Sequence, residues 1–465
     1  MTLMLEILVV LYFIFALRYF KLAVILLPLF FPAYLLGLQI FGIPFTFVEL
    51  LIDAVFLAFL FKLLLRTKPT PDNFRDFCTR VMQPLNREFW LAVLMIVAAA
   101  LISTLIAPKQ LLMADGNTVF YGQRIALGIL KGWIMTPVLM MVLFWTVIRE
   151  KEDMLLLLNA YALSCVLLAV SALWQVVSHN YLTLDARASG PFQSANYLAL
   201  FITPAILYAA IRLRESFLLL RKEQQWSWLK RLFGFRQKEF WRLALWTFAL
   251  LLLFLALLFT KSYAAILALG LASVFYFLQN FFKSGHKFSW KFFWLAVAAM
   301  SLLLLTIFVL DPKKWLLFFE FYQRTSSAVR IEVYTIAANL ILHHPLLGIG
   351  LGQFPAVYQL QGPSILGHNP YEWNMPHPHN LFFAFWLNLG LLGFAALLWI
   401  IWLSIAKIKP LLRSFAFENG LTRNKIRVMA FAFFLIILVH GFFDTPFFKN
   451  DLVLIFWTFL TLTFA

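Results

Sequence analysis

Two apolar runs separated by a single lysine decide the fold of this chain. Residues 242–282 read RLALWTFALLLLFLALLFTKSYAAILALGLASVFYFLQNFF, and Lys261 divides them into segments of 19 and 21 residues. A membrane-spanning helix needs about 20 mostly apolar residues to cross about 30 Å of hydrocarbon. Each segment therefore predicts one helix that spans a membrane.

The rest of the chain repeats this pattern. Of its 465 residues, 63% are hydrophobic and only 13% are charged, whereas soluble domains have about 45–50% apolar and about 25% charged residues. This composition excludes a soluble enzyme, a disordered scaffold, a collagen and a secreted disulfide framework. We predict an all-α, polytopic integral membrane protein with about 12–13 transmembrane helices. The thirteen apolar runs lie near residues 3–20, 21–37, 44–65, 89–107, 124–148, 154–177, 195–213, 242–260, 262–282, 292–310, 380–406, 426–445 and 450–465.

The positive charges predict the orientation of these helices. The formal net charge is +17, and 28 of the 38 Lys and Arg residues lie in connections that follow odd-numbered runs. Cytoplasmic connections of membrane proteins are enriched in Lys and Arg. We therefore assign these connections to the cytoplasm and the N-terminus to the outside, which explains the charge without a nucleic-acid partner.

One outer connection is much longer than the others. We predict transmembrane helices 1–10 in residues 1–310, a large periplasmic loop in residues 311–378, and helices 11–13 in residues 379–465. Long loops of this kind are often functional. Basic residues on the outer side do not serve topology, which makes four of them candidates for function: Arg187, Lys261, Arg324 and Arg330.

Arg187 and Arg330 lie in different local contexts. Arg187 precedes the turn formed by Gly190-Pro191, where it could bind substrate or meet lipid phosphate as an interfacial arginine. Arg330 lies near the start of residues 328–342, whose apolar positions predict an amphipathic helix on the outer leaflet. Its guanidinium could bind a phosphate bidentately or pair with a neighbouring carboxylate.

The outer loop ends in a cluster of histidines. His377 and His379 alternate with prolines that favour extended backbone, and Asn380 follows as a cap for the next helix. Histidine titrates near neutral pH and therefore suits general-base catalysis. Trp373, just upstream, could stack on a sugar or simply anchor the loop at the membrane interface.

The outer side shows no sign of a metal site. It has no two acidic residues at D-x-D spacing, although a divalent ion that grips a diphosphate needs neighbouring oxygen ligands. We expect arginines to neutralise any phosphate here. The pair His343-His344 is read as structural, and Gly348, Gly350 and Gly352 as a helix stop followed by close backbone packing.

Three motifs together resemble the O-antigen ligase and O-antigen polymerase superfamily. The first is His379-Asn380 followed by Gly390, Gly393 and Phe394. The second runs from Arg187 through Gly190-Pro-Phe192 to Asn196, and the third is Arg330 followed by residues 344–350 (HPLLGIG). Their order and their placement on the outer side support the resemblance.

The resemblance implies an integral-membrane glycosyltransferase of the GT-C type that needs no metal or other cofactor. Such enzymes work within membrane lipid at the periplasmic face of the bacterial inner membrane and take a glycan from undecaprenyl diphosphate. The acceptor is lipid A–core for a ligase, another lipid-linked glycan for a polymerase, and protein for related enzymes. The sequence leaves these three acceptors open.

The resemblance and the residues together suggest a mechanism. His379 is the expected base, with His377 as its rival, and Arg330, Arg187 and Lys261 are expected to bind the diphosphate. The family often has an arginine where this chain has Tyr263, and Lys261 could replace its charge.

Two further outer residues, His440 and Asp444, are spaced i, i+4 and could face the site or simply close their helix. The alternative function is a flippase for lipid-linked oligosaccharides or another polysaccharide transporter.

Overall fold

The computed structural model describes residues 2–40, 42–65, 71–113, 118–183, 185–223, 238–282, 326–413 and 421–465. The chain is about 78% helical, with two short hairpins as its only described sheets. The hairpins pair β1 (Gly37–Ile40) with β2 (Ile43–Thr46) and β3 (Leu111–Leu112) with β4 (Val119–Phe120). The described helices are α1 (Thr2–Arg18), α2 (Phe20–Leu26), η1 (Leu27–Leu35), α3 (Phe47–Leu64), α4 (Pro71–Val81), α5 (Pro84–Ile106), α6 (Gly122–Ile129), η2 (Leu130–Met135), α7 (Thr136–Val147), α8 (Lys151–Ser178), α9 (Ala195–Glu223), α11 (Lys238–Thr260), α12 (Tyr263–Phe282), α15 (Ser326–His343), α16 (Phe354–Leu366), α17 (Leu381–Arg413), α18 (Arg423–His440) and α19 (Asn450–Phe464).

These helices confirm an all-α, polytopic membrane protein. Among the described residues, six helical segments are long and apolar enough to cross a bilayer, and three shorter apolar helices cover Phe20–Leu35, Tyr263–Phe277 and Asp451–Phe464. The six longer segments are Pro84–Ile106, Gly122–Val147, Lys151–Ser178, Ala195–Leu220, Lys238–Thr260 and Leu381–Leu412. The predicted span at 292–310 and the first part of the predicted loop, residues 311–325, lie outside the described residues. The division into 1–310, 311–378 and 379–465 therefore stays a prediction.

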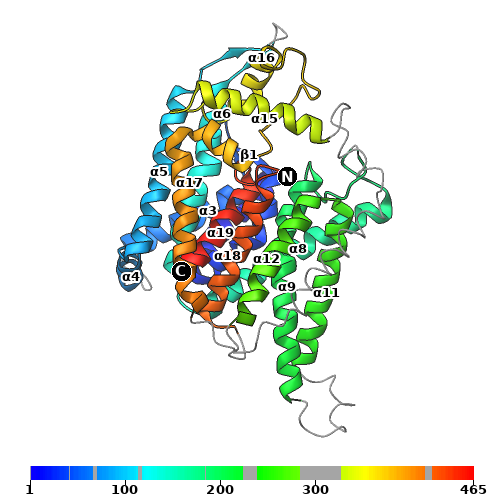
Figure 1. Ribbon diagram of the computed structural model, residues 1–465. Helices are drawn as coiled ribbons and strands as arrows, with labels where there is room; N and C mark the ends of the chain where they lie inside the picture. Colours follow the sequence, from blue (N-terminus) through cyan, green and yellow to red (C-terminus); the bar gives the residue numbers. More distant parts are fainter. Residues whose placement is uncertain are drawn as a thin grey trace.

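The helices stand side by side as one bundle (Figure 1). α9 packs along α11, α5 along α17, and α12 along α18. The C-terminal helix α19 lies inside the bundle, and residues 451–465 are all buried. A helix that is apolar on every side is expected in such a core position.

A cap lies across one end of the bundle, and we define it as residues 326–379. It contains α15 and α16, which lie above the ends of α17 and the neighbouring helices in Figure 1. The helix predicted over 328–342 is confirmed as α15. Its apolar residues Val333, Ile336 and Leu340 pack against α16 and Leu387 of α17, so this face meets protein rather than the lipid we expected.

Two glycines lock the cap onto α17. At Gly390 the helix is broken (φ 64°, ψ −168°), and Gly348 in the cap also has a positive φ of 70°. A Cβ atom on Gly348 would lie 2.3 Å from the Leu387 carbonyl oxygen, so the two backbones touch. The cap supplies hydrogen-bond partners for the backbone of α17 at this break. Leu391 N–H donates to Leu346 O (3.0 Å), and Leu387 O accepts a hydrogen bond from Ile349 N–H (2.9 Å). The close packing predicted for this glycine-rich stretch is confirmed.

Candidate active site

The last residues of the cap place two histidines at the start of α17. The Asn380 side chain caps that helix, because its Oδ1 accepts hydrogen bonds from the N–H groups of Phe382 (2.9 Å) and Phe383 (3.1 Å). His379, which directly precedes the N-cap residue Asn380, has a positive φ of 49°. A non-glycine residue in this conformation is uncommon and often marks a constrained functional position.

His379 faces a buried carboxylate from the other side of the bundle end. Its Nδ1 lies 3.5 Å from Oδ1 of Asp444, which is only 4% exposed. Asp444 lies in the turn after α18, where its Oδ1 also accepts a hydrogen bond from Thr445 N–H (2.8 Å). The two residues are 65 positions apart in the sequence, and only the packing of α17 beside α18 brings them together.

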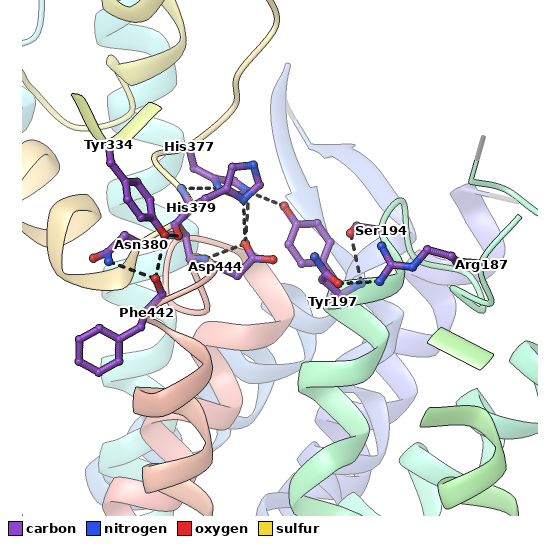
Figure 2. Close-up of polar contacts among 11 residues, drawn as sticks. Arg187, Ser194, Tyr197, Tyr334, His377, His379, Asn380, Phe442 and Asp444 are labelled. Atoms are coloured by element: carbon purple, nitrogen blue, oxygen red, sulfur yellow. Dashed lines mark hydrogen bonds and ion pairs between the residues drawn. The ribbon is translucent and has the colours of Figure 1, made fainter. Parts of the chain in front are cut away.

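His377 completes the cluster shown in Figure 2. Its ring lies edge-on to that of His379, with 4.5 Å between the centroids, and its Nε2 is 3.8 Å from Asp444 Oδ1. Nε2 is also 2.7 Å from the hydroxyl of Tyr197 on α9, whereas Nδ1 accepts the backbone N–H of His379 (3.4 Å). With Nδ1 used as an acceptor, a neutral His377 carries its proton on Nε2.

Burial and charge set the protonation of this cluster. Burial, together with the neighbouring His379, lowers the pKa of His377 to about 3, so its imidazole is neutral at physiological pH. Burial opposes ionisation of Asp444, but its interactions with His379, His377 and His440 outweigh burial and hold its pKa below the usual range. The site therefore combines an ionised carboxylate with a neutral histidine.

The cap helix α15 ties the two halves of the site together. The Tyr334 hydroxyl lies within hydrogen-bond distance of two carbonyl oxygens, those of His379 (3.0 Å) and Phe442 (2.8 Å). Arg330 lies one turn earlier on α15, and its charge acts on both Tyr334 and the buried ring of His440. The structure thus brings Arg330 to the His379–Asp444 side of the site.

Arg187 lies on the other side of Tyr197 (Figure 2). Its guanidinium donates to Thr260 O (2.6 Å) and to Asn196 Oδ1 (2.8 Å), and it also lies 3.4 Å from Asp185 Oδ2. These contacts tie the loop before α9 to the end of α11. Asn196 directly precedes Tyr197 in the first turn of α9, so Arg187 and the histidine cluster flank the same helix end.

The remaining predicted residues take different positions. Lys261 follows the residue whose carbonyl Arg187 binds, and it is exposed between α11 and α12. Tyr263 and Trp373 lie at the surface, with exposed fractions of 38% and 40%. His440 is buried, and its backbone oxygen accepts the N–H of Asp444 (3.1 Å). The backbone of this pair therefore closes the helix while the Asp444 side chain faces the site.

Sequence reasoning missed three residues of this site: Tyr197, Tyr334 and Lys449. The Lys449 Nζ atom lies 3.1 Å from the centroid of the Tyr197 ring, with Phe192 and Tyr34 further away at 5.4 and 5.6 Å. Weak signals were present, since Tyr197 follows motif residue Asn196 and Tyr334 lies one helical turn after Arg330. Nothing in the sequence marked Lys449 beyond its place on the predicted outer side.

The cluster also has the composition of a metal site. One ligand atom each from His377, His379 and Asp444 lies within 4.8 Å of the others. The hydrogen bonds from Thr445 to Asp444 and between His377 and Tyr197 already engage two of these three side chains. The expectation that arginines, rather than a metal ion, neutralise phosphate stays a prediction.

Comparison with known proteins supports the predicted resemblance for part of the chain. No curated protein matches the chain. The family model described as O-antigen ligase matches residues 248–398, a stretch that runs from α11 into α17 and includes Lys261, Arg330, His379 and Gly390. The match confirms, over these residues, the predicted resemblance to the O-antigen ligase and O-antigen polymerase superfamily.

Proposed function

We propose that this protein is an O-antigen ligase-like glycosyltransferase of the bacterial inner membrane. It transfers a glycan from undecaprenyl diphosphate to a hydroxyl group of lipid A–core, of another glycan or of a protein. The family match supports this class of reaction. The contact between His379 and the buried Asp444 is the observation that carries the proposal.

In this mechanism His379 is the general base. The ionised Asp444, whose Oδ1 lies 3.5 Å from Nδ1 of His379, favours the tautomer with the proton on Nδ1. This leaves Nε2 unprotonated and able to take the proton of the acceptor hydroxyl. His379 is 25% exposed and can meet a substrate. His377 is the weaker candidate, because its Nδ1 accepts a backbone N–H and its Nε2 faces Tyr197. Direct attack on the anomeric carbon would invert its configuration.

Positive side chains stabilise the leaving group. Negative charge grows on the lipid diphosphate as the glycosidic bond breaks, and cations held in position lower the barrier. Arg187, anchored by Asn196 and Thr260, lies next to the exposed Lys261 at the end of α11. Arg330 approaches from the cap, so positive charges flank the base on two sides.

The placement of the site supports a periplasmic reaction. The C-terminal ends of α8, α11 and α18 and the N-terminal ends of α9 and α17 meet at the capped end of the bundle. These ends border the connections that the positive charges predict to lie outside the cytoplasm. Arg80, Lys407, Arg423 and Arg427 belong to the opposite helix ends, as expected for the cytoplasmic side.

The transporter alternative has less support. Its strongest sequence signal was Lys131, a charge inside a predicted span. In the structure Lys131 Nζ lies 2.5 Å from Glu49 Oε2 and 3.8 Å from the centroid of the Phe45 ring. Lys131 therefore joins η2 to α3 and is not a lone charge inside the span.

The glycolipids of a deletion strain test the proposal. We expect glycan chains to accumulate on the polyprenyl carrier, and complementation with His379→Ala to leave them there. The matched control is His343→Ala, an exposed histidine of α15 whose Nδ1 lies 2.9 Å from Asn339 O of its own helix. Normal glycan transfer by His379→Ala would contradict the proposal, and loss of lipid flipping in the deletion strain would favour the transporter.

A further inference from the structure

The hydrogen bonds of the histidine cluster run in one direction and end at Tyr197. The backbone N–H of His379 donates to Nδ1 of His377, so the proton of this neutral ring lies on Nε2. That proton is donated to the hydroxyl oxygen of Tyr197, 2.7 Å away. The hydroxyl's own proton is then left for another acceptor.

Lys449 contacts the ring of the same tyrosine. Its ammonium lies 3.1 Å from the centroid of the Tyr197 ring, and its Nζ is buried with no hydrogen-bond partner among the described residues. A cation over the face of an aromatic ring is attracted to the ring's electrons. This contact holds the ring of Tyr197 in place.

The position of Tyr197 matches the leaving-group side of the proposed reaction. It lies between the His379 cluster and Arg187 (Figure 2). In a direct displacement the attacking and leaving oxygens lie on opposite sides of the anomeric carbon. If His379 meets the acceptor, the departing phosphate points away from His379 and toward the side of Tyr197 and Arg187.

We propose that Tyr197 contacts the substrate directly, by donating its hydroxyl proton to a phosphate oxygen of the lipid diphosphate. This inference rests on the proposed function, which it deepens by adding an uncharged donor to the cationic diphosphate site. No covalent step is involved. The hydrogen bond strengthens as negative charge accumulates on the phosphate, which makes it part of the transition-state stabilisation.

Binding of farnesyl diphosphate to the purified full-length protein tests the contact without requiring turnover. Tyr197→Phe keeps the ring over Lys449 and removes only the hydroxyl. We expect it to weaken diphosphate binding about 10- to 100-fold, as for a lost hydrogen bond to a charged group. Binding of farnesol, which lacks the phosphates, should not change.

The matched control is Tyr208→Phe. Tyr208 lies about 16 Å further along the same helix, and its hydroxyl also makes a 2.7 Å hydrogen bond, to Asn159 Oδ1. This variant should bind farnesyl diphosphate like the wild type. Equal diphosphate affinity for Tyr197→Phe and the wild type, or an equal loss of farnesol binding, would overturn the inference.

A second comparison separates direct contact from action through His377. Tyr197→Phe should slow glycan transfer about 10²–10³-fold, as for the loss of one oxyanion donor, both alone and in a His377→Gln background. No further loss in that background would show that Tyr197 acts only through His377 and would refute the contact. If Tyr197→Phe weakens diphosphate binding but the wild type transfers no glycan, the proposed function fails while the diphosphate site stands.

Discussion

Replacement of Asp444 by asparagine is the sharpest test of the base. The change removes one negative charge and keeps nearly the same shape. Asparagine Oδ1 can still accept the N–H of Thr445, which is 2.8 Å from the carboxylate oxygen. The turn after α18 should therefore fold as before, while His379 loses the negative charge that stabilises its protonated form.

The expected loss follows from the distance between the two groups. As His379 takes the acceptor's proton it becomes an imidazolium, 3.5 Å from Asp444 Oδ1. At that separation an effective dielectric constant of about 20–40 gives an attraction of about 2–5 kcal/mol. Removing it should slow transfer by about 30- to 5,000-fold.

The assay is glycan transfer from a lipid-linked donor by purified protein, with the amount of folded protein measured by thermal unfolding in detergent. Asp153→Asn is the matched control. Asp153 is also a buried carboxylate with a basic partner, since Lys21 Nζ lies 2.6 Å from its Oδ1. It lies at the opposite end of α8 from the site, so its replacement should leave the transfer rate per folded molecule unchanged.

A transfer rate for Asp444→Asn within threefold of the wild type would refute the reasoning. It would mean that the charge of Asp444 does not act on the base, and that the contact with His379 only holds the turn in place. An equal loss in Asp153→Asn would point to a general effect of buried carboxylates and would also remove Asp444 from the mechanism.

Three further predictions follow from other contacts. Gly390→Ala should lower the free energy of unfolding by about 2–6 kcal/mol, from backbone strain and two lost hydrogen bonds. The reason is that the new Cβ would lie 2.2 Å from Leu346 O. The control is Gly128→Ala, where a Cβ would have no atom within 4 Å, and thermal unfolding should show no loss of stability. Gln175→Ala should slow glycan transfer about tenfold or more, because Gln175 holds the loop that carries Arg187. Its Oε1 accepts the N–H of Gly190 (2.9 Å) and its Nε2 donates to Gly190 O (2.5 Å), and loss of these bonds leaves buried groups unpaired. An unchanged rate would show that the loop needs no such support. Stability should fall as the pH drops below about 6.5, because the pKa of His377 is about 3 in the folded protein and the unfolded chain then binds a proton that the folded one does not. In unfolding scans at several pH values, His377→Gln should flatten this dependence. Equal pH dependence of stability in the variant and the wild type would contradict the prediction.

The site shows what sequence motifs can and cannot supply. The motifs contained Arg187, Arg330 and His379. A motif is a set of residue types at fixed spacing, so it can be found from neighbouring positions in the sequence alone. They also contained Asn196, the hydrogen-bond partner of Arg187, but not the residues that contact His379 and His377. Asp444 was singled out only for its spacing from His440, and Tyr197 was passed over, because the contacts with His379 and His377 join distant parts of the chain.

The sequence by itself determined that this is an all-α membrane protein, and it predicts how the helices are oriented. Long apolar runs leave the backbone no way to satisfy its hydrogen bonds in lipid except as helices, and positive charges in alternate connections predict their orientation. Tertiary structure alone decided that α15 packs on protein, that Gly348 meets α17 at its break, and that a carboxylate from the end of α18 reaches the histidine before α17. Such contacts depend on which helices become neighbours, and hydrophobic periodicity does not encode that choice because apolar faces of similar width can pack in many pairings.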